Sequence, residues 1–199
     1  MKESIIQNLK NKKIVLATWG CDVRDHFEKI AWIPILNKIF RELIVFSTRN
    51  HYFSYGKESL NKKFLEIIKK EKPDFILIGL SYDEFEIETL LKIKNMSPKT
   101  RIIMHFGDDN WRFDDWSRYY ALFSDYITNS EKNNSCYGKD GIDMKKLSFL
   151  HGADCNFFKP LNLEKKYDVT FIGGAIRDRP DYIRYLRNNK INIKLFGLE

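Results

Sequence analysis

Short apolar runs alternate with longer amphipathic segments over the first 150 residues of the chain. Each run spans four to seven residues, and most of them end beside a glycine or a serine. Runs of this kind are typical of strands that are buried on both faces of a parallel sheet. The predicted strands are 13–19, 43–47, 75–80, 101–106, 125–129 and 147–150.

The segments between these runs predict helices. Apolar residues recur at i, i+4, i+7 and i+8 from Leu60 to Ile68, which places them on one helix face. Another helix is expected around 87–91, and one follows the first strand, where Pro34 either kinks it or opens a second helix. The polar and aromatic segment from Thr48 to Gly56 predicts a mobile loop.

Strands and helices that alternate in this way predict an α/β fold with a doubly wound parallel sheet and right-handed crossovers. Ligands of such sheets bind beyond the carboxyl ends of the strands. The loops of interest therefore begin at Gly20, Ser47, Ser81, Gly107, Ser130 and Gly173. Gly20, at the end of the first strand, is a predicted substrate-binding position.

The tail of the chain predicts one further βαβ unit. An apolar run ends at Gly173 and Gly174, a helical segment follows, and a second run closes at Gly197. We therefore expect a first domain over 1–151, a linker over 152–166, and the first unit of a truncated second domain over 167–199. Tandem α/β domains usually act across the cleft between them.

The net charge of +7 raises the question of an anionic partner. The lysines alternate with acidic residues, as in 66–72, and no basic block with interleaved aromatic residues is present. The sequence therefore predicts no nucleic-acid partner, whereas attraction to an anionic membrane surface or to a phosphate-bearing substrate stays open.

The three cysteines, Cys21, Cys136 and Cys155, lack metal-ligand spacing and are typical of a reduced intracellular protein. The N-terminus has no long apolar segment, and no run approaches the roughly 18 residues of a membrane span. A cytoplasmic location is expected.

The loop after the fourth strand is the densest in chemical groups. Asp108 and Asp109 follow the strand end, where paired carboxylates favour a divalent metal or a general base. One of them can equally cap the following helix. Trp111 and Arg112 add a stacking surface and a contact for anions, although a tryptophan is more often part of a core. His105 lies inside the strand and is expected to be partly buried rather than catalytic.

The glycine turn of the tail predicts a phosphate contact. Gly173 and Gly174 allow backbone amides to approach an anion, and Arg179 can hold phosphate in a bidentate manner. A tight turn with surface arginines is the simpler alternative. The P-loop, the three-glycine dinucleotide fingerprint, zinc spacing and the Gly-x-Ser-x-Gly elbow are all absent from the sequence.

In their order and spacing, several segments resemble bacterial glycosyltransferases of the two-domain GT-B architecture. The nearest group is similar to spore maturation proteins and carries a group 1 glycosyltransferase domain in its C-terminal half. The segments are 72–78 (KPDFILI), 106–113 (FGDDNWRF), 125–129 (DYITN) with Tyr137 and Gly138, 152–160 (GADCNFFKP), and 168–174 (DVTFIGG) with Arg179. The likeness covers most of the chain after Leu65.

The resemblance implies transfer of a sugar from a nucleotide-sugar donor to a glycan, lipid or protein acceptor, without a cofactor or bound metal. It implies that Asp108 or Asp109 acts as a base or holds an acceptor hydroxyl. Gly173, Gly174 and Arg179 would face the donor diphosphate. The sequence departs from the family pattern in two respects. The nucleotide and diphosphate contacts expected after Glu199 are missing, and so is the second-domain carboxylate that would hold the ribose. A complete donor site is therefore not expected.

Two other classes remain as alternatives. A flavodoxin-like cobalamin-binding or receiver domain would suit the central strands. The cobalamin motif is not matched, because Asp25 and His26 are adjacent. A receiver domain needs a phosphorylatable aspartate at the end of the third strand, and none is present there. A non-catalytic partner module that keeps only an acceptor-binding domain is the other alternative.

Overall fold

The structure is a computed structural model that describes residues 2–24, 26–81, 83–107, 109–129, 134–149 and 158–197. The chain forms two compact units, Met1–Gly152 and Ala153–Glu199.

The first unit is built on a six-stranded parallel sheet with the strand order β2-β1-β3-β4-β5-β6. The strands are β1 (Lys13–Thr18), β2 (Glu42–Ser47), β3 (Phe75–Gly79), β4 (Arg101–Phe106), β5 (Tyr126–Asn129) and β6 (Leu147–Phe149). The predicted α/β class and the doubly wound parallel sheet are confirmed. All six predicted strands lie within a residue or two of the observed ones.

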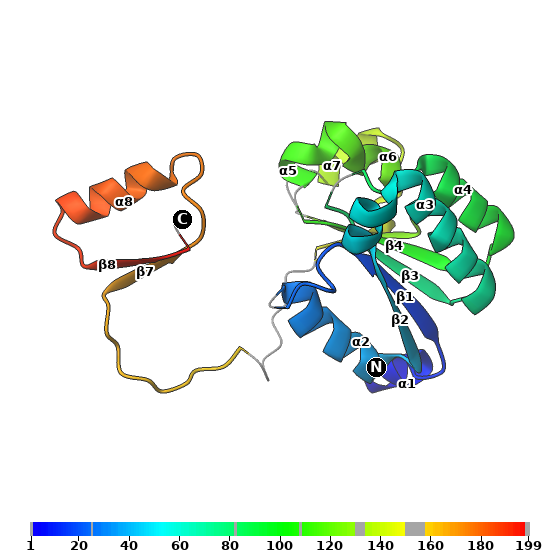
Figure 1. The fold of residues 1–199 in the computed structure, drawn as a ribbon, viewed down its shortest axis with the longest axis horizontal. Helices are drawn as coiled ribbons and strands as arrows, with labels where there is room; N and C mark the ends of the chain where they lie inside the picture. Colours follow the sequence, from blue (N-terminus) through cyan, green and yellow to red (C-terminus); the bar gives the residue numbers. More distant parts are fainter. Residues whose placement is uncertain are drawn as a thin grey trace. The chain divides into compact units, whose positions relative to one another are not determined.

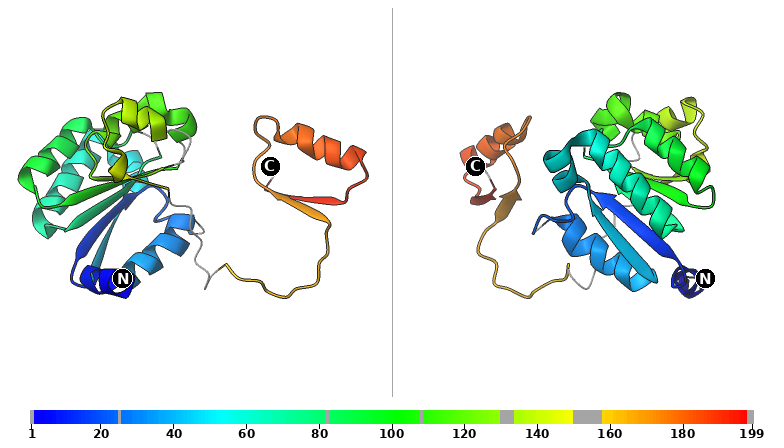
Figure 2. Two further views of the ribbon diagram at one scale, coloured as in Figure 1. Left: turned by 180° about the vertical axis from the view of Figure 1, so that it is seen from behind. Right: turned by 45° about the vertical axis from the view of Figure 1, so that its right-hand side comes forward.

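Helices cover both faces of this sheet. The views in Figures 1 and 2 show α3 and α4 on one face and α2 on the other. The helical elements are α1 (Lys2–Leu9), η1 (Glu28–Trp32), α2 (Ile33–Ile39), α3 (Thr48–Glu71), α4 (Ile87–Met96), α5 (Asp109–Arg112), η2 (Phe113–Ser117), α6 (Arg118–Ala121), α7 (Asn134–Lys139) and η4 (Met144–Lys146). Pro34 lies in the first turn of α2, which follows the π-helical turn η1 without a break, since Trp32 and Ile33 both keep helical backbone angles.

The core lies between the sheet and helices α3 and α4. Phe64 and Ile68 of α3 and Leu90 and Ile93 of α4 are fully buried. They pack on alternate residues of the strands, which are Val15, Ala17, Ile76, Ile78, Ile102, Met104 and Ile127. Burial of each such side chain contributes about 2 kcal/mol, so this layer stabilises the sheet that carries the site.

The expectation of a loop over Thr48 to Gly56 is wrong, because α3 begins at Thr48. The Ser47 hydroxyl accepts a hydrogen bond from the Asn50 amide at 3.3 Å and caps the helix. Gly56 alone leaves the helical conformation (φ 81°, ψ 172°) and kinks α3 there. The polar and aromatic composition of the segment indicated a loop, although the segment forms the capped first turns of a helix.

The second unit is a single parallel βαβ unit. It consists of β7 (Val169–Ile172), α8 (Arg179–Asn188) and β8 (Ile193–Phe196). Residues 158–166, before β7, are exposed and form neither helix nor strand.

Asp125 ties together three elements at the amino edge of the sheet. Its carboxylate accepts hydrogen bonds from Lys94 Nζ at 2.5 Å, the Ile102 amide at 2.8 Å and Arg101 at 3.1 Å. Burial by itself would raise the pKa of Asp125, but the bonds from Lys94 and Ile102 outweigh it and lower that pKa.

We expect Asp125→Asn to lower the free energy of unfolding by about 2 kcal/mol at neutral pH, because charge-assisted bonds are lost. Since the folded pKa is below the unfolded value, this contribution is present above the unfolded pKa and disappears as the pH falls through the folded one. Urea unfolding between pH 7 and pH 3 measures it. Asp83→Asn, at an exposed pair with Lys57, serves as the control, with about 0.5 kcal/mol or less. A loss for Asp125→Asn that does not change with pH would contradict the assignment.

Candidate functional site

A row of mainly polar residues crosses the sheet near its carboxyl edge. The register pairs Ser47 with Thr18, Thr18 with Gly79, Gly79 with His105, His105 with Thr128, and Thr128 with Ser148. Laterally paired residues of parallel strands point to the same face of the sheet. This is the face opposite α3 and α4, so the row lies outside the main core. A polar row at the carboxyl edge is where a doubly wound sheet binds its ligands.

The strand order reverses between β1 and β3, where Thr18 lies beside Gly79. Chain connections leave in opposite directions at such a point and open a crevice above the strand ends. A Cβ atom on Gly79 would lie 3.0 Å from Thr18 Oγ1, 3.2 Å from the Trp32 ring and 3.4 Å from Glu28 Oε1. The absence of a side chain at Gly79 therefore makes room for the carboxylate of Glu28.

Glu28 is buried at this point, with 5% of its surface exposed. Its Oε2 accepts a hydrogen bond from the Gly20 amide at 2.5 Å. Burial raises the pKa of Glu28, while the Thr18 hydroxyl, the Gly20 amide and His26 act in the opposite direction. A carboxyl group in such surroundings is suited to proton transfer or to orienting a neighbouring base.

His26 is the neighbour of this carboxylate. Its Nδ1 lies 3.5 Å from Glu28 Oε2 and accepts a hydrogen bond from the Glu28 backbone amide at 3.5 Å. The side chain is 34% exposed, so solvent and ligands reach the imidazole but not the carboxylate. The ring packs directly over Gly20, where a Cβ atom would lie 1.9 Å from Nδ1. The predicted site residue Gly20 thus lies at the centre of this cluster.

Gly20→Ala is expected to displace His26 from Glu28, because the added methyl group and the imidazole cannot occupy the same space. NMR signals of the His26 ring would shift, and the free energy of unfolding would fall by about 1–3 kcal/mol. Gly107→Ala is the matched control, since its Cβ would meet nothing closer than 3.7 Å. Unchanged His26 signals in Gly20→Ala would contradict the packing described.

His105 lies further along the row. It shares a hydrogen bond with the Thr128 hydroxyl at 2.7 Å, and its ring meets Trp32 edge-on at 4.9 Å. The histidine is half-buried, in agreement with the expectation of a partly buried residue. Trp32 therefore connects the Glu28 cluster to the β4 and β5 end of the row.

Of the two predicted catalytic aspartates, Asp108 lies outside the described residues. Asp109, the first residue of α5, is fully buried. Its Oδ2 accepts hydrogen bonds from Asn129 at 3.0 Å and from the Tyr137 hydroxyl at 3.2 Å. These bonds tie α5 to the end of β5 and to α7, so the geometry gives Asp109 a role in positioning the loop after β4.

Asp109→Ala is expected to lower the free energy of unfolding by about 3 kcal/mol, because the Tyr137 hydroxyl and the Asn129 amide lose a buried acceptor. Thermal and urea denaturation measure the loss. Asp109→Asn keeps an acceptor oxygen and should cost less. In the control Asp114→Ala, the aspartate is 82% exposed, and we expect about 0.5 kcal/mol or less. Equal effects at Asp109 and Asp114 would contradict a positioning role.

The predicted binding pair Trp111 and Arg112 follows Asp109. The guanidinium of Arg112 lies 4.0 Å from the ring centre of Trp111 and 4.2 Å from that of Trp116. It also donates a hydrogen bond to the Ser81 carbonyl at 3.2 Å, which links α5 to the end of β3. Trp111 is 50% exposed and keeps one surface available for stacking.

In the second unit, Gly173, Gly174 and Arg179 lie together after β7. Gly173 has a φ of 147°, a conformation that favours glycine. Arg179 opens α8, and its Nη1 donates to the Gly174 carbonyl at 3.3 Å. The arginine thus bends back over the glycine turn and contacts its carbonyl oxygen.

Sequence reasoning missed the pairing of Glu28 with His26. His26 stands alone in the sequence, and no motif connects it with a glutamate two residues later. The useful signal is positional, since both residues follow Gly20 at the end of the first strand, beside the reversal of strand order. Within the residues that the structure covers, no three His, Cys, Asp or Glu side chains gather as metal ligands. No helix among those residues has the length and apolarity needed to cross a membrane.

Comparison with known proteins supports the fold. No protein-family model matches the chain, and no curated protein matches it. Among solved structures, the apo form of the lipopolysaccharide outer core galactosyltransferase WaaB aligns with a TM-score of 0.53 and 14% identity, over 94% of this chain and 68% of that one. UDP-GlcNAc 2-epimerase from Neisseria meningitidis bound to UDP-GlcNAc aligns with a TM-score of 0.54 and 8% identity, over 93% and 66% of the two chains. These likenesses establish a shared Rossmann-like α/β fold.

Proposed function

We propose that this chain provides the acceptor-side domain and part of the donor side of a glycosyltransferase that uses a nucleotide sugar. The observation that carries the proposal is the pair formed by buried Glu28 and accessible His26 at the reversal of strand order. The fold shared with a galactosyltransferase and with an enzyme that binds UDP-GlcNAc supports the choice of reaction class.

In this proposal His26 accepts the proton of an acceptor hydroxyl. The Glu28 carboxylate, 3.5 Å from Nδ1, is proposed to favour a proton on that nitrogen in place of its contact with the Glu28 amide. This tautomer leaves Nε2 to act as the base, and the carboxylate stabilises the resulting imidazolium. The acceptor oxygen bonds to the anomeric carbon of the sugar while the bond from that carbon to the diphosphate breaks. The products are the glycosylated acceptor and a nucleoside diphosphate.

The remaining predicted residues have supporting roles. Gly20 shapes the loop that holds His26, and the exposed ring of Trp111 beside Arg112 offers a stacking surface for substrate. Gly173, Gly174 and Arg179 are proposed to face the diphosphate. Asp108 stays a prediction as a second candidate base. A glycan, lipid or protein acceptor and a cytoplasmic location also stay predictions.

The test is release of nucleoside diphosphate from UDP-galactose, UDP-N-acetylglucosamine and GDP-mannose, with a panel of simple glycosides as acceptors. We expect His26→Gln to lower the rate by about 100-fold or more, because a general base contributes 10² to 10⁴. Glu28→Gln should lower it by about tenfold, since it acts through His26. His51→Gln, at a histidine on α3 away from the row, should leave the rate unchanged.

NMR of the His26 ring gives a second readout that does not need turnover. If adding a donor or a glycoside shifts the His26 signals of the unchanged chain, binding at this edge is supported. The same addition should not shift the His26 signals of the Gly20→Ala variant. No diphosphate release, together with a His26 ring that no donor or glycoside affects, would contradict the proposal and favour a non-catalytic partner module.

A further inference from the structure

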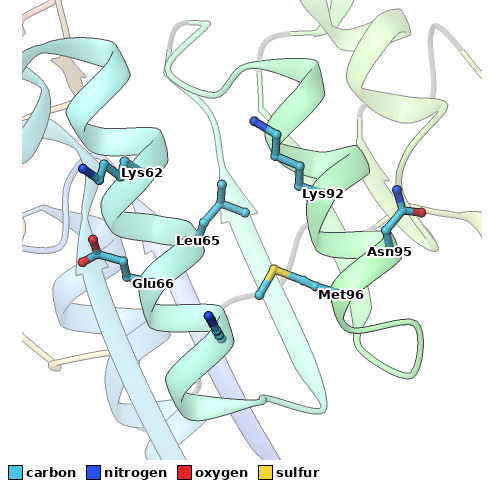
Figure 3. Close-up of a pocket in the computed structure, with 7 residues that line it drawn as sticks. Lys62, Leu65, Glu66, Lys92, Asn95 and Met96 are labelled. Carbon is cyan, nitrogen blue, oxygen red and sulfur yellow. The ribbon is translucent and has the colours of Figure 1, made fainter.

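A groove of about 620 Å³ runs between α3 and α4. Figure 3 shows Leu65 of α3 and Met96 of α4 facing one another between the two helices, with Lys62 and Lys92 on either side. Lys69 of α3 also lines it. The groove shares no residue with the polar row, and the inference drawn from it is independent of the proposed glycosyl transfer.

The lysines of these two helices divide into two sets. Helix α3 carries five lysines and α4 carries two. The four that do not line the groove form ion pairs: Lys57 with Asp83, Lys63 with Glu66, Lys70 with Glu71, and Lys94 with Asp125. Lys62, Lys69 and Lys92 line the groove, and none of them forms an ion pair with any residue in the described ranges. Positive charge without internal compensation is thus concentrated around this groove.

The floor between these lysines is apolar. Leu65 is half-buried against the core, and Met96 is 40% exposed. Methionine is flexible and polarizable, and it is common at surfaces that adapt to a bound helix. Glu66 also lines the groove, but its carboxylate pairs with Lys63 at 3.2 Å. An occupant therefore meets apolar contacts at the centre and cations along both sides.

We propose that this groove binds an acidic amphipathic helix of a partner protein. Lys62 and Lys69 are seven residues apart, which is two turns or about 10.5 Å along α3. Carboxylates two turns apart on one flank of the partner helix match them, and a carboxylate on the opposite flank reaches Lys92. Apolar side chains between the two flanks contact Leu65 and Met96, as in other helix-in-groove complexes.

The spacing of the lysines favours a helix over the other anionic partners. A bilayer presents mobile headgroups, which do not match the fixed two-turn spacing of Lys62 and Lys69. The phosphates of a nucleic acid would neutralise the same lysines, but they would leave Leu65 and Met96 without apolar contacts. An amphipathic helix uses both features.

The test is fluorescence anisotropy with a labelled synthetic helical peptide, about four turns long, that carries leucines along one face and glutamates on both flanks. The comparison is a peptide of the same composition, shuffled so that leucines and glutamates are spread over all faces of the helix and no apolar face remains. Binding of the first and not of the second is expected, and it should weaken as salt is raised.

Variants of the full chain locate the binding. We expect the triple change Lys62→Glu, Lys69→Glu and Lys92→Glu to weaken affinity by about tenfold or more. The control triple change Lys10→Glu, Lys38→Glu and Lys145→Glu alters the net charge equally at exposed lysines elsewhere, and it should weaken affinity by less than about twofold. Met96→Ser should weaken binding, whereas Leu91→Ser should not, because Leu91 is 43% exposed on α4 outside the groove.

Circular dichroism checks that each variant is folded. Equal loss of affinity in the two triple variants would overturn the proposal, because binding would then depend on net charge alone. Failure to distinguish the two peptides would overturn it as well. Groove-dependent binding to phosphatidylglycerol vesicles without binding to the ordered peptide would assign the surface to a membrane and overturn the protein partner.

Discussion

The parallel pairing of β1 with β3 is the constraint on which the candidate site depends. It places Thr18 beside Gly79 at the carboxyl edge, and it is also where the order of the strands reverses. The connection after β1 returns across this point and brings Glu28 and Trp32 over the strand ends. A different neighbour for β1 would leave the same residues in the sequence and remove the crevice in which they meet.

A buried carboxylate is costly unless polar groups compensate it, and the loop after β1 provides that compensation. The Gly20 amide donates to Glu28, and the His26 ring packs against Gly20 while its Nδ1 lies near the same carboxylate. The glycine, the histidine and the glutamate therefore depend on one another. Only the histidine is accessible, so a molecule outside the cluster can contact the imidazole but not the buried carboxylate.

Much of the fold could be predicted from the sequence because parallel central strands are apolar on both faces. The runs at 13–19 and 75–80 differ from β1 and β3 by a single residue at one end. The segment Thr48 to Gly56 could not be predicted in this way. Its helix depends on the Ser47 cap, and Tyr52 and Phe53 pack against Trp19 at ring distances of 6.0 and 5.4 Å. The helical conformation of this segment therefore depends on contacts with residues outside it, which its own sequence does not reveal.

The sequence by itself determined the α/β class, the strands and the loops at which polar residues gather, because hydrophobic periodicity is a local property. It also singled out Gly20, through the rule that strand ends bind ligands. Only the tertiary structure decided that Glu28 is buried beside His26 and that Asp109 is enclosed by Asn129 and Tyr137. It also decided that three lysines without an ion-pair partner among the described residues meet between α3 and α4. Burial and ion pairing depend on which elements pack together, and that information is distributed over the whole chain.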